Sequence, residues 1–345
     1  MPVKPVLLIS GPTASGKSSL ALKLAKDLEG EVLNVDSVQV YKQFDIGSAK
    51  ICFHEMDNVP HHLLDLKEPD ASYNVAEFIA EAATVAEDVA QRGKQTIIAG
   101  GTGLYVTALF HGLADLPQGD LEIRSALETQ SSAELFSRLE GCDPETAKRL
   151  HENDRLRVIR ALETFILAGE SSSQIHERHA YSGANFSGLM LILCWERTKL
   201  YERIKHRTAT MFEDGLIEET RTLLDRYGDN IQGLRTLGYA QAVAFLKGEL
   251  GEGELKDQVS QQTRRFAKRQ MTFWRNEPNK RGWLTRPTDA EQALYIGDES
   301  ATGAKKLKGF RVFSCAYSEL LDKVRTRLAG EFTCNEVWYL QASAL

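Results

Sequence analysis

The sequence has few cysteines and no pair of them at the spacing of a metal site or a redox motif. The five cysteines of this 345-residue chain are odd in number and widely scattered: Cys52, Cys142, Cys194, Cys315 and Cys334. Such usage argues against a disulfide framework or a zinc site and is typical of reduced thiols in a cytosol. No H-E-x-x-H or comparable histidine spacing occurs either, so histidine does not indicate a metal centre.

Long apolar runs are also missing. No stretch approaches about 18 consecutive apolar residues, so we expect no membrane-spanning helix and no membrane partner. The start, MPVKPVLLISG, has too short an apolar run for a signal peptide. With 42% hydrophobic and 26% charged residues the composition is that of a soluble globular protein, and we predict a cytoplasmic location. The net charge of −6 argues mildly against a nucleic-acid partner, although it conceals a local basic segment.

Short, continuous apolar runs alternate with helical spacing in the first part of the chain. Runs of this kind are typical of buried parallel strands, and helical spacing separates them over residues 75–89. We therefore predict an α/β fold with a parallel sheet. The predicted strands are VLLIS (6–10), EVLNVD (31–36), QTIIAGG (95–101) and LMLILCW (189–195).

The pattern changes near Pro117, beyond which helical signals dominate until a linker, SGANFSG, at residues 182–188. The strand at 189–195 then resumes the sheet. We predict a core of residues 1–118 and 189–285 with a helical insertion domain at 119–188. Residues 286–345 form a C-terminal extension to which the sequence assigns no role. Long helices are expected around 197–227 and 256–276.

The stretch GPTASGKS fits the phosphate-binding pattern G-x-x-x-x-G-K-[ST] and stands between a predicted strand and a predicted helix. Its glycines let backbone N–H groups surround phosphate oxygens, its lysine adds positive charge, and its last hydroxyl can bind Mg²⁺. The N-terminus of the following helix also favours an anion. The predicted phosphate-binding residues are Gly11, Pro12, Thr13, Ala14, Ser15, Gly16, Lys17 and Ser18. With this loop after its first strand, the predicted parallel sheet is a P-loop NTPase-like core.

Two further polar residues follow predicted strands and so line the same crevice. Asp36 ends the second strand and can act as a general base, as a Mg²⁺ ligand, or only as a helix cap. Thr102 lies in GGTGLY after the third strand, where a plain strand-to-helix turn is the alternative interpretation.

The ordered motifs of this chain resemble those of the tRNA dimethylallyltransferases, also called tRNA isopentenyltransferases. The resemblance covers roughly residues 5 to 280 and does not include the C-terminal extension. It rests on GPTASGKS, DSVQVY with DIGSAK, HHLLDL, GGTGLY, NDRLRVIRALE, ERTKLYERI, LRTLGYAQAV and TRRFAKRQMTFWR.

The resemblance implies a transfer of a dimethylallyl group from its diphosphate to the exocyclic amine of an adenosine beside the anticodon of tRNA. Asp36 would then be the general base on that amine. Thr13, Lys17 and Ser18 would hold the diphosphate and Mg²⁺. Thr102 and Arg124 would steady the leaving group and line the reaction channel.

A basic segment with interleaved aromatics supports an RNA partner. Residues 256–281 contain eight Lys or Arg (256, 264, 265, 268, 269, 275, 280, 281) and two acids (257, 277), together with Phe266, Phe273 and Trp274. An amphipathic helix with core aromatics is the alternative interpretation. The tRNA-binding residues implied by the resemblance are Asp36, Ser37, Val38, Gln39, Arg157, Arg160, Arg235, Gly238, Tyr239, Lys268, Arg269 and Arg275.

The sequence departs from the family pattern at several positions. Ser48 replaces the usual threonine and Ile51 the usual proline, while Leu156 and Ala240 stand where many relatives have Gln and Arg. The last two put individual tRNA contacts in doubt. Three rival functions are a P-loop small-molecule kinase, an isopentenyltransferase of free adenine nucleotide, and a non-enzymatic RNA-binding module. We expect a monomer.

Overall fold

The computed structural model describes residues 5–179, 186–280, 312–313, 317–330 and 336–341. The chain forms two compact units. Unit 1 comprises Met1–Leu109 and Phe186–Leu345, and unit 2 comprises Phe110–Asn185. Most of the predicted linker, residues 182–185, lies outside the described residues. So do residues 286–311 of the predicted C-terminal extension.

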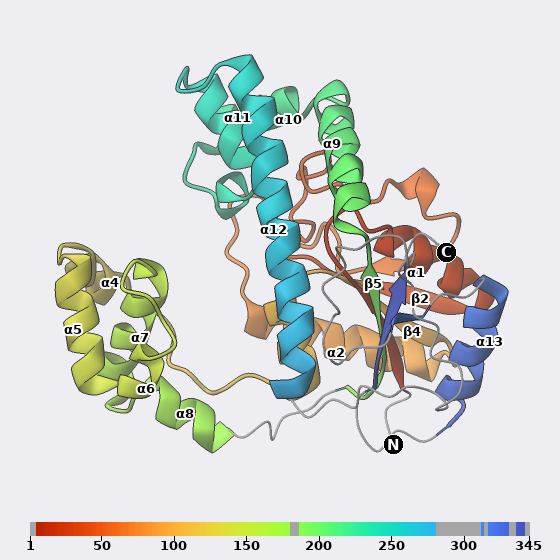
Figure 1. Ribbon diagram of the computed structural model, residues 1–345, viewed down its shortest axis with the longest axis horizontal. Helices are drawn as coiled ribbons and strands as arrows, with labels where there is room; N and C mark the ends of the chain where they lie inside the picture. Colours follow the sequence, from red (N-terminus) through yellow and green to blue (C-terminus); the bar gives the residue numbers. More distant parts are fainter. Residues whose placement is uncertain (1–4, 180–185, 281–311, 314–316, 331–335, 342–345) are drawn as a thin grey trace, which may run out of the picture. The chain divides into compact units, whose positions relative to one another are not determined.

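Unit 1 is built on a parallel sheet of seven strands in the order β3-β2-β4-β1-β5-β7-β6, and every strand pair in it is parallel (Figure 1). The fold class is the one that the sequence predicts. The four predicted strands are confirmed as β1, β2, β4 and β5, with bounds within a residue of those expected. The strands are β1 Val6–Ser10, β2 Gly30–Val35, β3 His61–His62, β4 Gln95–Gly100, β5 Gly188–Cys194, β6 Val312–Phe313 and β7 Glu336–Gln341.

Helices α1 (Lys17–Asp27) and α13 (Tyr317–Leu328) cover one face of this sheet. Alternate residues of a strand point to the same face, so Leu7 and Ile9 of β1 join Leu24 of α1 and Leu320 of α13 in one core. Helices α2 (Val75–Gln91) and α3 (Gly103–His111) follow β3 and β4 in the chain. The core fixes the carboxyl ends of β1, β2 and β4, from which the candidate site is built.

The C-terminal residues extend the sheet, which the sequence did not predict. Strand β7 pairs with β5 from Leu189 opposite Glu336 to Cys194 opposite Gln341, and β6 pairs with β7. Trp338 is buried in the core shared with α1. Without β7, strand β5 would expose an apolar edge, so this part of the extension completes the sheet of unit 1.

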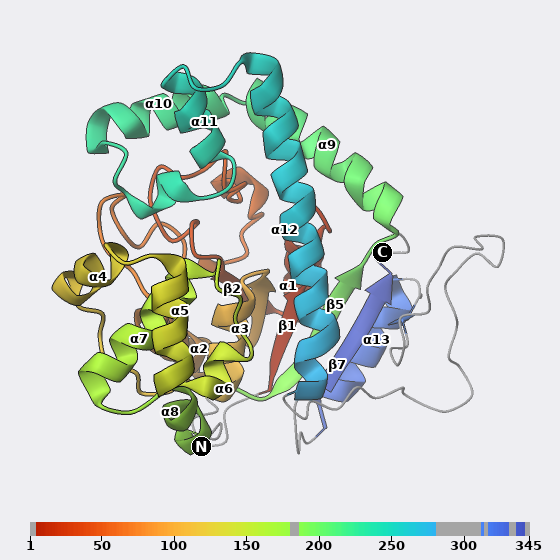
Figure 2. The same ribbon diagram turned by 60° about the vertical axis from the view of Figure 1, so that its left-hand side comes forward.

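A second group of helices follows β5. The predicted helical segment 197–227 is two helices, α9 (Arg197–Glu213) and α10 (Leu216–Tyr227), which are separated at Gly215 because its φ of 104° ends the helical path. The 3₁₀ turn η2 (Gln232–Arg235) and α11 (Tyr239–Leu246) lead into the 29-residue α12 (Glu252–Lys280). Figures 1 and 2 both show α12 running alongside α9, with which it is in contact.

All elements in the described part of unit 2 are helices around a core of Leu135, Leu139, Val158 and Leu162. They are α4 (Leu121–Glu128), α5 (Ser132–Cys142), α6 (Pro144–Ala147), α7 (Arg155–Ala168) and α8 (Ser172–His179). Gly169, with φ 69°, ends α7 in the left-handed conformation. Within the described ranges of the whole chain, no helix is long and apolar enough to cross a membrane.

Candidate active site

The phosphate loop joins β1 to α1 in a conformation that requires its glycines. Gly16 caps α1 with φ 89°. A Cβ on Gly11 would lie 2.9 Å from the Leu193 carbonyl oxygen, closer than real Cβ contacts allow. Gly11 therefore lets the loop pack directly against β5, and Gly16 adopts the left-handed conformation at which α1 begins. The helix dipole of α1 points its positive end at the same place.

Trp195, which lies between β5 and α9, and Arg203 of α9 hold the backbone of this loop. The Trp195 indole N–H donates to the Ser15 carbonyl at 2.9 Å, and the Arg203 Nε donates to the Ala14 carbonyl at 2.8 Å. The Arg203 guanidinium stacks 4.5 Å from the centre of the Trp195 ring. Because these contacts fix the loop backbone, its N–H groups are oriented before any ligand binds.

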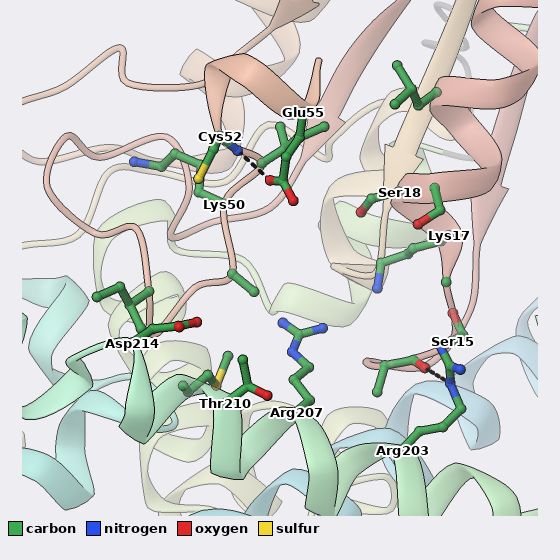
Figure 3. Close-up of a pocket in the computed structure, with 18 of the residues that line it drawn as sticks. Ser15, Lys17, Ser18, Lys50, Cys52, Glu55, Arg203, Arg207, Thr210 and Asp214 are labelled. Carbon is green, nitrogen blue, oxygen red and sulfur yellow. Dashed lines mark hydrogen bonds between the residues drawn. The ribbon is translucent and has the colours of Figure 1, made fainter. Parts of the chain in front are cut away.

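Two cations converge beside the loop. Lys17 and Arg207 point from α1 and α9 into a cavity of about 800 Å³ (Figure 3). Burial, and then the positive charge of Arg207, lower the pKa of Lys17 to about 8, against the opposing effect of the Asp36 carboxylate. Burial also lowers the pKa of Arg207. Two buried cations kept next to each other, although burial disfavours their charges, are typical of a site for a multiply charged anion.

A second cavity, of about 360 Å³, is bordered by the same two cations. It is lined by Asp36 and Thr102, and Lys17, Ser18 and Arg207 line both cavities. The structure thus brings the predicted base and the predicted phosphate loop to one place. Asp36 Oδ1 accepts from the backbone N–H groups of Val38 at 2.8 Å and Gln39 at 3.3 Å. Its Oδ2 accepts no hydrogen bond from the described residues, so one carboxylate oxygen is fixed and the other can receive a proton.

The loop after β2 is held by Glu219, which the sequence analysis did not single out, and by Tyr239, for which it predicted a tRNA contact. The Glu219 carboxylate accepts from the N–H groups of Asp45, Ile46 and Gly47 at 2.8–3.2 Å. The Tyr239 hydroxyl donates to the same carboxylate at 2.6 Å. These contacts fix the backbone of the DIGSAK motif.

Several predicted tRNA-binding side chains have partners within unit 1. The Tyr239 ring has 0% exposure, so its side chain holds the DIGSAK loop and cannot stack on a base in this arrangement. Gln39 donates to the Ser48 carbonyl at 2.9 Å, and Arg235 donates to Asn230 Oδ1 at 2.6 Å. The tRNA contacts of Gln39, Arg235 and Tyr239 stay predictions, as do those of Gly238, Ser37 and Val38.

Helix α12 exposes the predicted basic residues Lys268, Arg269 and Arg275. Arg269 and Phe266 line the cavity of Asp36, with the guanidinium 5.7 Å from the ring centre. Trp274 is fully buried in the core, as the alternative interpretation of this segment expects. Helix α12 therefore combines a basic exposed side, a cavity-lining aromatic and a structural aromatic.

The arginines predicted in unit 2 surround a fully buried carboxylate. Glu163 has 0% exposure and accepts from Arg124 at 2.9 Å and from Arg160 at 2.6 Å. Although burial opposes it, these hydrogen bonds keep the pKa of Glu163 below its usual value. Arg157 pairs with Asp154 and is largely exposed. The described contacts give Arg124 and Arg160 a structural role; their contacts with substrate stay predictions.

Comparison with known proteins decides the family. The family model described as IPP transferase matches residues 39–277. The chain belongs to the IPP transferase family. It is 44% identical over 283 residues to tRNA dimethylallyltransferase 1 of Citrifermentans bemidjiense, covering 82% of this chain and 92% of that protein. The tRNA dimethylallyltransferase of Geobacter sulfurreducens is 40% identical over 296 residues, 84% of this chain and 95% of that one.

Solved structures agree with this IPP transferase assignment. The tRNA isopentenylpyrophosphate transferase of Bacillus halodurans matches with a TM-score of 0.59 and 38% identity, over 80% of this chain and 88% of that one. A eukaryotic dimethylallyltransferase acting on tRNA matches with a TM-score of 0.70 and 28% identity, over 84% of this chain and 75% of that one. These neighbours have the P-loop NTPase-like fold, so the resemblance seen in the sequence motifs is confirmed.

Proposed function

We propose that this protein is a tRNA dimethylallyltransferase. It transfers the dimethylallyl group of dimethylallyl diphosphate to the N6 amine of the adenosine adjacent to the anticodon and releases diphosphate. One observation carries the proposal. The Asp36 carboxylate and a phosphate loop with two converging cations line one cavity, and Lys17, Ser18 and Arg207 border both it and the neighbouring cavity of about 800 Å³.

The transfer is a displacement at the allylic carbon. The lone pair of the adenosine N6 forms the new C–N bond while the C–O bond to the diphosphate breaks, and its electrons leave with the diphosphate oxygen. The proton lost by N6 goes to the Asp36 carboxylate, whose Oδ1 is held by two backbone N–H groups. A delocalised aromatic amine is a weak nucleophile, so removal of this proton as the bond forms assists the reaction.

The leaving diphosphate gains negative charge as the bond breaks. Lys17, Arg207 and the backbone N–H groups of the phosphate loop would stabilise that charge, because they are fixed at the site before the reaction. Thr102 borders the same cavity and supplies a hydroxyl. Arg207 is an addition to the residues predicted from sequence.

The residues present fit a Mg²⁺ ion bound mainly through the diphosphate. Mg²⁺ prefers oxygen ligands and often takes only one or two from the protein. Ser18 offers an exposed hydroxyl at the start of α1, beside the cavity of Asp36. No cluster of three or more His, Cys, Asp or Glu suited to a metal exists in the part of the chain that the structure describes. Ser18 would therefore hold the ion, which supplies positive charge for the diphosphate.

The acceptor side of the site is formed by α12. Arg269 and Phe266 line the cavity of Asp36, where a cation can meet a phosphate and a ring can stack on an unpaired base. An amine inside a base stack cannot reach the allylic carbon, so we expect the target adenosine to be extruded from the anticodon loop. The proposal includes a monomeric enzyme in the cytoplasm, with contacts of Arg124, Arg157 and Arg160 to the RNA or its channel.

A panel of acceptors tests the proposal. The purified protein is incubated with radiolabelled dimethylallyl diphosphate, Mg²⁺ and one acceptor: an anticodon stem-loop, the same stem-loop with guanosine at the target position, a continuous duplex, or adenosine monophosphate. We expect label only in the first. Label mainly in the monophosphate would instead favour a free-nucleotide enzyme. Label in none, with phosphate transfer from ATP to a small acceptor, would favour a kinase.

A further inference from the structure

Gln270 of α12 joins the two loops on which the diphosphate site depends. Its side-chain carbonyl accepts from the backbone N–H of Thr13, in the phosphate loop, at 2.8 Å. Its side-chain N–H₂ donates to the backbone carbonyl of Gly101, next to Thr102, at 3.0 Å. The side chain is 7% exposed, so water cannot readily replace these bonds.

Gly101 is packed closely between Gln270 and the phosphate loop. A Cβ on Gly101 would lie 2.4 Å from the Gln270 nitrogen and 3.4 Å from the Gly11 carbonyl oxygen. The turn after β4 therefore has no space for a side chain between the phosphate loop and α12. Only a side chain with one acceptor and one donor meets both loops, because an ionised carboxylate cannot donate to the Gly101 carbonyl.

Gln270 also lies among the acceptor-side residues of α12. Its neighbour Arg269 is exposed and lines the cavity of Asp36, as does Phe266 one turn earlier. Any RNA bound to α12 therefore restrains the helix that holds the phosphate loop and the Gly101–Thr102 turn through Gln270. Restraint of a shared element lowers the entropic cost of ordering the second site, which couples the two binding events.

We propose that Gln270 is a positioning residue that couples RNA binding on α12 to diphosphate binding by the phosphate loop and the Thr102 turn. This inference rests on the proposed function, since it takes RNA as the ligand of α12. Coupling is reciprocal: RNA tightens diphosphate binding by the same factor by which diphosphate tightens RNA binding. Gln270 itself lines the cavity of Asp36, and in this role it acts through the backbones of Thr13 and Gly101.

The test measures the coupling directly in the full chain. The affinity for inorganic pyrophosphate with Mg²⁺ is determined with and without a saturating anticodon stem-loop, by calorimetry. We expect the RNA to tighten pyrophosphate binding at least about fivefold in the wild type, within the usual range of about 5–150-fold. In Gln270→Met, which keeps the length and loses both hydrogen bonds, the ratio should fall to about 1. RNA affinity without pyrophosphate should stay within about threefold.

Gln262→Met is the matched control, because Gln262 is a partly buried glutamine on the same helix outside both cavities. It should keep the wild-type ratio. A wild-type ratio of 1, or a Gln270→Met ratio equal to that of the wild type, overturns the inference. If the wild type transfers dimethylallyl to the stem-loop but shows no coupling, only this inference fails. If the stem-loop is never modified, the proposed function fails.

A second variant keeps the test valid if Gln270→Met does not fold. In Gln270→Glu the introduced carboxyl can donate to the Gly101 carbonyl only when protonated. Its coupling, relative to the wild type at the same pH, should therefore rise as the pH falls from 8 to about 5. Lys17, Asp36, Arg207 and Arg269 border the cavity in both proteins, so comparison with the wild type at each pH removes the pH effects that the two proteins share. A ratio that does not change with pH contradicts the role of the donated hydrogen bond.

Discussion

Replacement of Asp36 by asparagine should remove the proton acceptor and preserve its surroundings. The oxygen of the introduced amide can still accept from the N–H groups of Val38 and Gln39, so the loop should keep its conformation. The side chain can no longer take the proton from N6. A positioned general base contributes about 10²–10⁴-fold, so Asp36→Asn should lower the single-turnover transfer rate by roughly that factor.

The same substitution removes a negative charge that raises the pKa values of both Lys17 and Arg207. The pKa of Lys17 in Asp36→Asn should therefore be lower than the wild-type value of about 8, so the assay is run near pH 6.5, where Lys17 stays charged. Donor binding should be unchanged or tighter, because an anion bound near Asp36 no longer meets a like charge. The assay is rapid-quench transfer of labelled dimethylallyl with both substrates saturating. Near-normal turnover, or a parallel loss of donor affinity, would refute the assignment of Asp36 as the base.

Three further outcomes follow from the charges of the structure. Because the pKa of Lys17 is about 8, Lys17 loses its charge above that pH, and the affinity for dimethylallyl diphosphate should then fall by up to about tenfold per pH unit. Calorimetry should show no such fall in Lys17→Met, and an equal fall in both proteins would contradict the role of the Lys17 charge. Arg269→Ala should flatten the salt dependence of tRNA binding by about one phosphate contact, while Arg221→Ala on α10 should not, and equal slopes in filter binding would remove Arg269 from the interface. Glu163→Gln should lower the free energy of unfolding of unit 2 in urea by about 1–3 kcal/mol, because one amide cannot pair with two arginines that are only partly exposed to water. A change below about 0.5 kcal/mol would show that solvent already satisfies Arg124 and Arg160.

Much of the fold could be predicted because its strands are short apolar runs with clear boundaries. The runs at β1, β2, β4 and β5 are buried along nearly their whole length, and a sequence pattern detects such strands directly. Strand β3 is only His61–His62, and β6 only Val312–Phe313, so neither carries a pattern of its own. Both exist because a neighbouring strand offers a partner, which is a long-range effect.

Some residues of the candidate site could likewise be predicted from the sequence, and others could not. Lys17, Asp36 and Thr102 could be predicted because each follows a strand whose carboxyl end borders the crevice. Arg207 lies in a charged helix between an exposed His206 and a buried Thr208, so the sequence does not show which way its side chain points, and only the packing of α9 turns it into the cavity. Gln270 was missed because its two partners are 257 and 169 residues away in the chain. The resemblance implies a tRNA contact for Tyr239, and this stays a prediction; what the sequence did not indicate is that its side chain is fully buried.

The central claim is the identity and position of the product. The measurement is mass spectrometry of nucleosides and of anticodon-loop fragments from an unmodified tRNA after incubation with the protein, dimethylallyl diphosphate and Mg²⁺. The account predicts N6-dimethylallyladenosine at the position adjacent to the anticodon, and none with Asp36→Asn at short times. A tRNA recovered unmodified under saturating substrates, or modified at any other atom or position, would contradict it.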